Sequence, residues 1–275
     1  MDAVAIVRYS QNVQRTLEEG LNLLGGFGNL KYPVLVKPNL CTIKDGTGHS
    51  ITDTEVVNAI IDLLLEKDPK ISIRIIESDS QSKDAQECFD KFGYTEFCQK
   101  KQEAGFNVST VDLSRIPLTQ ISFDGEYFKD PELPEILTKP HYFISIAAAK
   151  THGLSYITGV LKNLFGVLPR KGKSVYHPKI HEIITDLARI LKPELNIVDA
   201  RIGVEDWNGP ITHKIGAFIL GKQPVSVDSV MTKLFELNPR AVSHLVKSSK
   251  YDLGLLDPDV VGEKIEDMCV RFNIP

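Results

Sequence analysis

The segment His141-Tyr142-Phe143-Ile144-Ser145-Ile146-Ala147 is an almost wholly apolar run, and Ala148-Ala149-Lys150-Thr151-His152-Gly153 follows it directly. A short continuous apolar run is typical of a strand that is buried on both faces, as the strands of parallel sheets are. Lys150 and His152 then stand at the carboxyl end of this strand. The segment therefore predicts a parallel sheet in which a strand end carries polar side chains.

Strands and helices alternate on both sides of this run. Further strands are expected at residues 34–37, 71–76, 107–113 and 195–198, and helices at residues 13–24, 56–65, 157–165 and 180–191. Thr52, with Glu55 three residues later, has the signature of a helix cap. The predicted fold is a single α/β domain over residues 1–275, with a mostly parallel, mixed sheet and helices on both faces.

Composition excludes several classes of protein. The net charge of −4 argues against general nucleic-acid binding, and no apolar run reaches the length of a membrane span. The first residues show no basic region followed by an apolar stretch, so no signal peptide and a cytoplasmic location are expected. The cysteines, which form no C-x-x-C pair, are Cys41, Cys88, Cys98 and Cys269. No iron–sulfur cluster and no cysteine-based zinc site are therefore expected in this chain.

Residues 136–180 contain no aspartate and no glutamate, although the chain is acidic overall. The basic residues of this window are Lys139, His141, Lys150, His152, Lys162, Arg170, Lys171, Lys173, His177 and Lys179. One interpretation is a solvated basic face. Because several of the lysines stand among Gly, Phe and Leu, a concave site with positive potential, suited to an anionic ligand, is favoured.

Polar residues also gather where the predicted strands end. In α/β sheets, ligands bind outside the carboxyl ends of the strands. The residues at these ends are Lys37, Asn39, Glu77, Asp79, Lys150, His152 and Asp199. Residues expected to bind an anionic ligand are Lys37, Asn39, Lys162, Asn163 and Arg170.

Two kinds of chemistry fit such a pocket. In the first, His152 or His181 carries protons while lysines, including Lys150, hold a carboxylate or phosphate. In the second, a divalent metal is bound by His177, His181, Asp199 and Asp228, a ligand set that suits zinc, iron or nickel. Local hydrogen bonding of each histidine is the alternative to both. The run Gly172-Lys173-Ser174 lacks the first glycine of a phosphate-binding P-loop at the required spacing.

Several short motifs, taken together, resemble one family. They are Val36-Lys37-Pro38-Asn39-Leu40, Ala149-Lys150-Thr151-His152, Leu161-Lys162-Asn163-Leu164-Phe165-Gly166, Asp199 with Asn208-Gly209-Pro210, and Pro224-Val225-Ser226-Val227-Asp228. In this order, over about residues 30–262, they resemble the family called domain of unknown function 362. Many relatives look like iron–sulfur proteins because they carry an added ferredoxin-type cysteine array. This sequence lacks the array, so the resemblance implies no cluster here.

Three functions are compatible with these observations. The first is an enzyme that acts on an anionic small molecule, with or without the help of a metal. The second is a non-catalytic accessory or binding module for a separate redox, iron–sulfur or cofactor-maturation protein, as the resemblance implies. The third is metal storage or delivery. Neither nucleic acid nor a membrane is expected as a partner, and neither substrate nor reaction type follows from the sequence.

Overall fold

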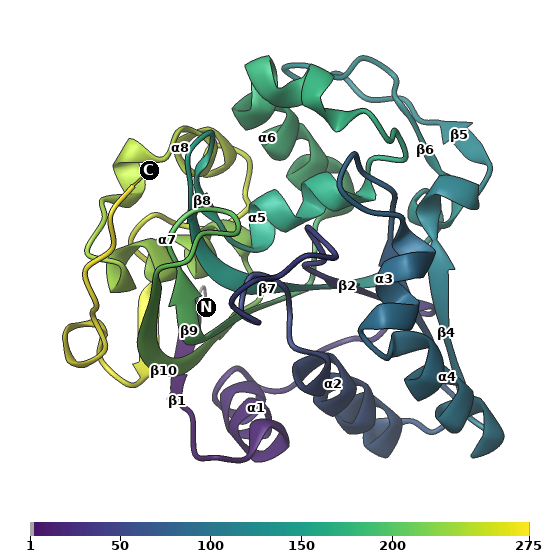
Figure 1. The fold of residues 1–275 in the computed structure, drawn as a ribbon, viewed down its shortest axis with the longest axis horizontal. Coiled ribbons are helices and arrows are strands. Elements are labelled where there is room, and N and C mark those ends of the chain that lie inside the picture. Colours follow the sequence, from purple (N-terminus) through teal and green to yellow (C-terminus); the bar gives the residue numbers. More distant parts are fainter. Residues whose placement is uncertain (1–2, 275) are drawn as a thin grey trace.

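The structure is a computed structural model that describes residues 3–274, and its centre is a nine-stranded sheet. The strands run in the order β11-β1-β10-β9-β7-β2-β3-β4, and β8 pairs with the end of β7 (Figure 1). Their bounds are β1 Ala3–Arg8, β2 Val34–Pro38, β3 Ser72–Glu77, β4 Asn107–Asp112, β7 Tyr142–His152, β8 Tyr156–Thr158, β9 Leu195–Val204, β10 Thr212–Gly221 and β11 Asp259–Gly262. Two further short strands, β5 Leu118–Gln120 and β6 Glu132–Pro134, form a separate ribbon.

The sheet has a parallel and an antiparallel part. Strands β9, β7, β2, β3 and β4 are parallel neighbours, whereas β10 pairs antiparallel with both β9 and β1. In β7 every residue from Tyr142 to Thr151 is buried, as expected of a central parallel strand. The mixed, mostly parallel sheet predicted from the sequence is confirmed.

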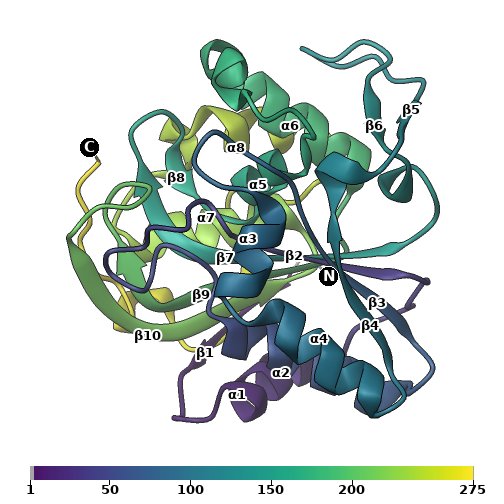
Figure 2. The same ribbon diagram turned by 45° about the vertical axis from the view of Figure 1, so that its right-hand side comes forward.

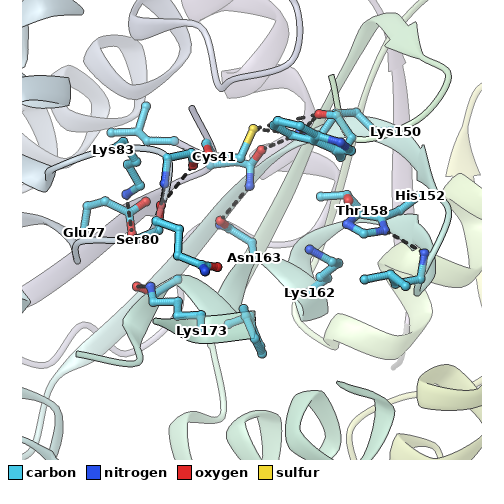
Figure 3. A pocket seen from close by; sticks show the side chains of 18 of the residues that line it. Cys41, Glu77, Ser80, Lys83, Lys150, His152, Thr158, Lys162, Asn163 and Lys173 are labelled. Carbon is cyan, nitrogen blue, oxygen red and sulfur yellow. Dashed lines mark hydrogen bonds and ion pairs between the residues drawn. The ribbon is translucent and has the colours of Figure 1, made fainter. Parts of the chain in front are cut away.

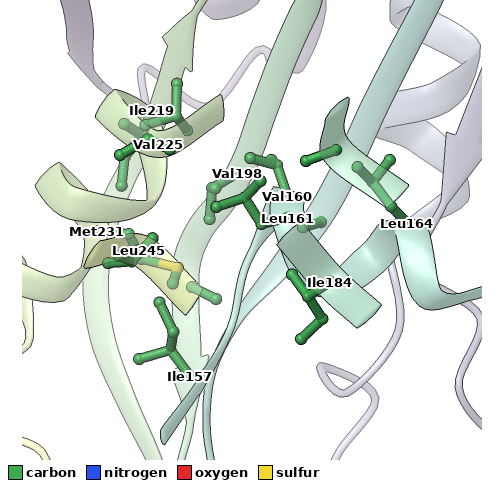
Figure 4. Packing of buried hydrophobic residues seen from close by; sticks show 14 of the residues in the cluster. Ile157, Val160, Leu161, Leu164, Ile184, Val198, Ile219, Val225, Met231 and Leu245 are labelled. Atoms are coloured by element: carbon green, nitrogen blue, oxygen red, sulfur yellow. The ribbon is translucent and has the colours of Figure 1, made fainter. Parts of the chain in front are cut away.

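Helices cover both faces of the sheet (Figures 1 and 2). On one face lie α1 Val13–Leu23, α2 Thr54–Lys67, α3 Ala85–Lys91 and α4 Tyr94–Glu103; on the other lie α5 Val160–Asn163, α6 Ile180–Leu191, α7 Pro224–Leu234 and α8 Ser243–Ser248. Side chains alternate along each strand, so Val34 and Val36 pack under α1 and α2 while Leu35 faces the other core. Figure 4 shows this second core, where Val160, Ile184 and Val198 meet.

The helix predicted at residues 180–191 forms with those bounds, but the cap predicted at Thr52 is wrong. Asp53 caps α2 instead, because its side chain accepts a hydrogen bond from the Glu55 amide. The Thr52 hydroxyl accepts from the Asn39 amide and donates to the Ile146 carbonyl. Thr52 thus holds the end of β2 against β7.

The helix predicted at residues 157–165 is interrupted at Gly159. Tyr156–Thr158 forms β8, and only then does the single turn of α5 begin. A side chain at position 159 would meet Asp228, because a Cβ placed there would lie 2.1 Å from the Asp228 Oδ1 atom. No helix in the described part of the chain is long and apolar enough to cross a membrane.

Candidate functional site

A cavity of about 570 Å³ lies at the carboxyl ends of β2, β3 and β7, beside α5 (Figure 3). The polar residues that line it are Lys37, Asn39, Cys41, Glu77, Ser80, Gln81, Ser82, Lys83, Lys150, His152, Thr158, Lys162, Asn163, Lys173, His177 and Asp206. Strand ends therefore bring together Lys37, Asn39, Lys150 and His152, as the sequence predicted. Lys162 and Asn163 join them from α5.

One end of the cavity holds a buried carboxylate among lysines, which we call the Glu77 cluster: Lys37, Glu77, Lys83 and Lys173. The Lys37 Nζ atom lies 2.7 Å from Glu77 Oε2, and the Lys83 Nζ atom lies 3.2 Å from Glu77 Oε1. Lys173 donates to the Ser78 hydroxyl at 2.8 Å. Gly166 leaves room for the cluster, because a Cβ there would lie 2.7 Å from Lys37 Nζ.

Charge is unbalanced in this cluster. Burial alone would raise the pKa of Glu77, but the three lysines more than offset it, so this pKa lies below its usual value. Burial lowers the pKa of Lys37, and Glu77 only partly restores it. Burial likewise lowers the pKa of Lys173 to about 7. One carboxylate is therefore the only negative charge among the three lysines of the Glu77 cluster, and the cluster retains an excess of positive charge.

Lys150 occupies the centre of a second set of contacts. Its ammonium group donates to Asn39 Oδ1 at 2.9 Å, to the Ser50 carbonyl at 2.6 Å and to the Trp207 carbonyl at 3.2 Å. Cys41 Sγ lies 3.4 Å away. The ammonium is fully buried and has no carboxylate partner among the described residues. Lys150 thus fastens the loops after β2 and β9 to each other and adds positive charge beneath the cavity.

Three polar groups at the opposite end of the cavity have no hydrogen-bond or ion-pair partner among residues 3–274: Lys162 Nζ, the Thr158 hydroxyl and His152 Nε2. The Lys162 Nζ atom makes no hydrogen bond or ion pair and lies 5.8 Å from the centre of the Phe165 ring. The Thr158 hydroxyl is buried without a hydrogen bond. His152 uses only its Nδ1 atom, which accepts from the Leu154 amide at 3.0 Å. Figure 3 shows these side chains on one side of the pocket, away from Glu77.

The contact of His152 fixes its protonation state. An Nδ1 atom that accepts a hydrogen bond carries no proton, so the neutral ring holds its proton on Nε2. Burial, with the positive charges of Lys162 and Lys150, lowers the pKa of His152 to about 2. In this state the ring is a neutral hydrogen-bond donor toward the cavity, and the proton-carrying role expected from the sequence stays a prediction.

Asp228 positions α5 instead of contacting a ligand. Its carboxylate accepts from the Val160 amide at 2.7 Å and from the Leu161 amide at 2.9 Å, at the start of the turn that carries Lys162. Burial raises the pKa of Asp228 to about 7, although both hydrogen bonds favour the ionised form. The side chain is fully buried in α7 and does not line the cavity.

The four residues expected to bind a metal are not brought together. His177 lines the cavity, but His181 lies outside it, with its Nδ1 atom 3.2 Å from that of His244. Asp199 pairs with Arg201 at 2.8 Å and lines a second cavity, and Asp228 is occupied by backbone amides. Within residues 3–274, no group of three or more His, Cys, Asp or Glu side chains is placed to hold a metal.

Arg170, expected to contact the ligand, is exposed and does not line the cavity. Conversely, no sequence pattern indicates Lys83 or Thr158 as a site residue. Thr158 faces Lys150 across the β7–β8 pairing, which cannot be inferred without knowing that residues 156–158 form a strand. Lys173 belongs to the acid-free window and Glu77 stands at a strand end, but only the folded chain shows that the charge of Lys173 acts on Glu77.

Comparison with known proteins agrees with this architecture. The thylakoid-associated protein sll1697 of Synechocystis sp. is 26% identical to this chain over 247 residues, which cover 85% of this chain and 73% of that protein. The structure of the lactate racemase apoprotein from Thermoanaerobacterium thermosaccharolyticum matches with a TM-score of 0.52 and 12% identity. The match covers 85% of this chain but only 58% of that structure, and it is a likeness of fold alone.

The family comparison confirms the resemblance seen in the motifs. The profile of the family described as domain of unknown function (DUF362) matches residues 34–233, which is most of the chain. The matched range includes Lys37, Lys150, His152, Lys162 and Asp228. The chain therefore belongs to the domain of unknown function 362 family.

Proposed function

We propose that this chain is an enzyme that binds a small carboxylate or phosphate compound in the cavity at the strand ends. The observation that carries the proposal is the charge of the lining. Five lysines line the cavity against only two acids, Glu77 and Asp206; the lysines are Lys37, Lys83, Lys150, Lys162 and Lys173.

The positions of the lysine groups support an anionic ligand. The Nζ atoms of Lys37, Lys83 and Lys150 each have two or more acceptors within the protein. Lys162 has none, and burial together with Lys150 lowers its pKa to about 8. A bound anion would supply the missing counter-charge and would stabilise the ammonium form.

The unpartnered donors beside Lys162 favour catalysis over simple storage of an anion. The Nε2–H group of neutral His152 and the hydroxyl of Thr158 can donate hydrogen bonds to an oxygen that gains charge during a reaction. A metal-assisted version of the enzyme is not part of the proposal. Of the four metal-binding residues expected from the sequence, His177 alone lines this cavity.

Thr158→Val is expected to weaken phosphate binding about two- to tenfold, because it removes one donor to the ligand and keeps the shape of the side chain. Stability should not fall and is expected to rise by about 1 kcal/mol, since the buried hydroxyl has no hydrogen-bond partner in the protein. Isothermal titration calorimetry and thermal unfolding measure the two effects.

The matched control is Thr185→Val. The Thr185 hydroxyl is also buried, but it donates to the His181 carbonyl at 2.9 Å and lies outside the cavity. This variant should lose about 1 kcal/mol of stability and keep full phosphate binding. Equal phosphate binding by wild type and Thr158→Val would count against the proposed ligand position, and no phosphate binding by wild type would remove it.

A separate redox, iron–sulfur or cofactor-maturation partner stays a prediction, as does a cytoplasmic location. The Synechocystis relative is named as thylakoid-associated, so fractionation of cells should ask whether this chain sediments with membranes. A pull-down from native lysate that recovers no redox protein would weigh against the accessory role.

A further inference from the structure

We propose that Lys162 takes up a carbonyl-bearing anion by forming an imine between its Nζ atom and the carbonyl carbon of the ligand. This inference rests on the proposed function and specifies its substrate class, a 2-oxo acid or a phosphorylated aldehyde or ketone. The geometry that supports it is the position of one unpartnered amine beside two unpartnered hydrogen-bond donors.

Lys162 differs from the other four lysines of the cavity. Lys37 and Lys83 are held by Glu77, Lys150 by three oxygens, and Lys173 by Ser78 and Gly166. Acceptors placed in this way favour the ammonium form, whose nitrogen has no lone pair to attack a carbonyl carbon. Lys162 Nζ has no hydrogen-bond acceptor among residues 3–274, and its contact there is a cation–π contact with the Phe165 ring, whose centre lies 5.8 Å away. It is the amine most open to attack a ligand.

The surroundings of Lys162 also favour its neutral form. A lysine that is desolvated and close to another cationic group is activated as a nucleophile. Burial, with Lys150 nearby, lowers the pKa of Lys162 to about 8, so a fraction of the amine is neutral near neutral pH. The position of the amine is fixed because Asp228 holds the first amides of α5.

Two neighbouring groups, the Thr158 hydroxyl and the His152 Nε2–H group, are placed to donate hydrogen bonds to the carbonyl oxygen of the ligand. Thr158 is 2% exposed, and its hydroxyl lacks a partner, which is a costly state for a buried polar group. His152 keeps its Nε2–H group free, because the Leu154 amide occupies Nδ1. Both groups lie on the same side of the cavity as Lys162 (Figure 3). A carbonyl oxygen placed between them would be polarised while its carbon faces the amine.

The step balances without a further reagent. The lone pair of the neutral amine forms the N–C bond while the C=O π bond breaks, and the proton released from nitrogen passes to the oxygen. A second proton then lets the hydroxyl leave as water. One lysine ammonium and one carbonyl group thus give one protonated imine and one water molecule. Nothing is oxidised or reduced.

Reductive trapping tests this inference. The full chain is incubated with pyruvate, an anionic ketone, or pyridoxal 5′-phosphate, an anionic aldehyde, and then with sodium borohydride. Mass spectrometry of the peptides locates the adduct. We expect it on Lys162, with a yield that rises as the pH passes about 8. Lys162→Arg should lose the adduct but keep phosphate binding, because the charge is retained.

The matched control is Lys179→Arg, since Lys179 is exposed and does not line the cavity. This variant should keep the Lys162 adduct in full, and phosphate should protect wild-type Lys162 from trapping. Labelling spread evenly over exposed lysines, or no adduct with either probe, would overturn the imine. If phosphate still binds in that case, the proposed anion pocket survives; if phosphate binding also fails, both proposals fall.

Discussion

Replacing Glu77 with alanine is expected to lower the free energy of unfolding by about 3–5 kcal/mol. Glu77 is 1% exposed and is the carboxylate partner of Lys37 and Lys83 within the Glu77 cluster. Its removal leaves buried ammonium groups without a counter-charge, which costs far more than the loss of a surface ion pair. Urea unfolding of wild type and variant measures the difference.

The control for this variant is Glu87→Ala, which removes an exposed carboxylate from α3 and should change stability by no more than about 0.5 kcal/mol. Acid provides a second check. Because the pKa of Glu77 is lowered from 4.5 on folding, its contribution is present above pH 4.5 and is lost as the pH falls through the folded value. If wild type and Glu77→Ala differ by less than about 1 kcal/mol in free energy of unfolding at neutral pH, Glu77 is not the stabilising counter-charge of the Glu77 cluster.

The sheet could be predicted from the sequence because apolar runs and helical periodicity are local signals. The run at residues 141–147 becomes the centre of β7, and the predicted helix at residues 180–191 becomes α6. Parallel strands end on the same side of a sheet, so Lys37, Asn39 and Lys150 could be expected to meet. Here the topology of the fold converts a sequence pattern into a spatial prediction.

The positions of residues that depend on strand register or on contacts between distant segments could not be predicted in this way. The pairing of β7 with β9 shifts between Ala148 and Lys150, and Asp199 lines a different cavity from Lys150. The Asp228 carboxylate accepts hydrogen bonds from the first amides of α5, and this contact requires the helical turn after Gly159. Ligand chemistry suggests both carboxylates as metal ligands, whereas in the structure Asp199 pairs with the nearby Arg201 and Asp228 binds amides from a distant segment.

The affinity for sulfate, an anion that does not titrate in this range, is expected to fall about tenfold per pH unit between pH 7 and pH 8 and about 100-fold per pH unit above pH 8. Lys162 and Lys173 have pKa values of about 8 and about 7 because both are buried near other lysines. An anion binds their protonated forms, so binding is tightest below pH 7, requires uptake of a proton by Lys173 above pH 7 and requires a second by Lys162 above pH 8. Calorimetry in buffers with different ionisation enthalpies detects that uptake.

Lys162→Met isolates the contribution of the free lysine. We expect it to weaken sulfate binding about 30-fold or more, because it removes the charged group that has no hydrogen-bond acceptor or ion-pair partner among the described residues. It should also abolish the part of the pH dependence centred near pH 8, leaving the decline near pH 7 that belongs to Lys173. Lys179→Met, at an exposed site outside the cavity, should leave both the affinity and its pH dependence nearly unchanged. A wild-type affinity that is constant from pH 7 to pH 10 would show that neither buried lysine takes up a proton with the anion, since a lysine left neutral at high pH offers no charge to bind it.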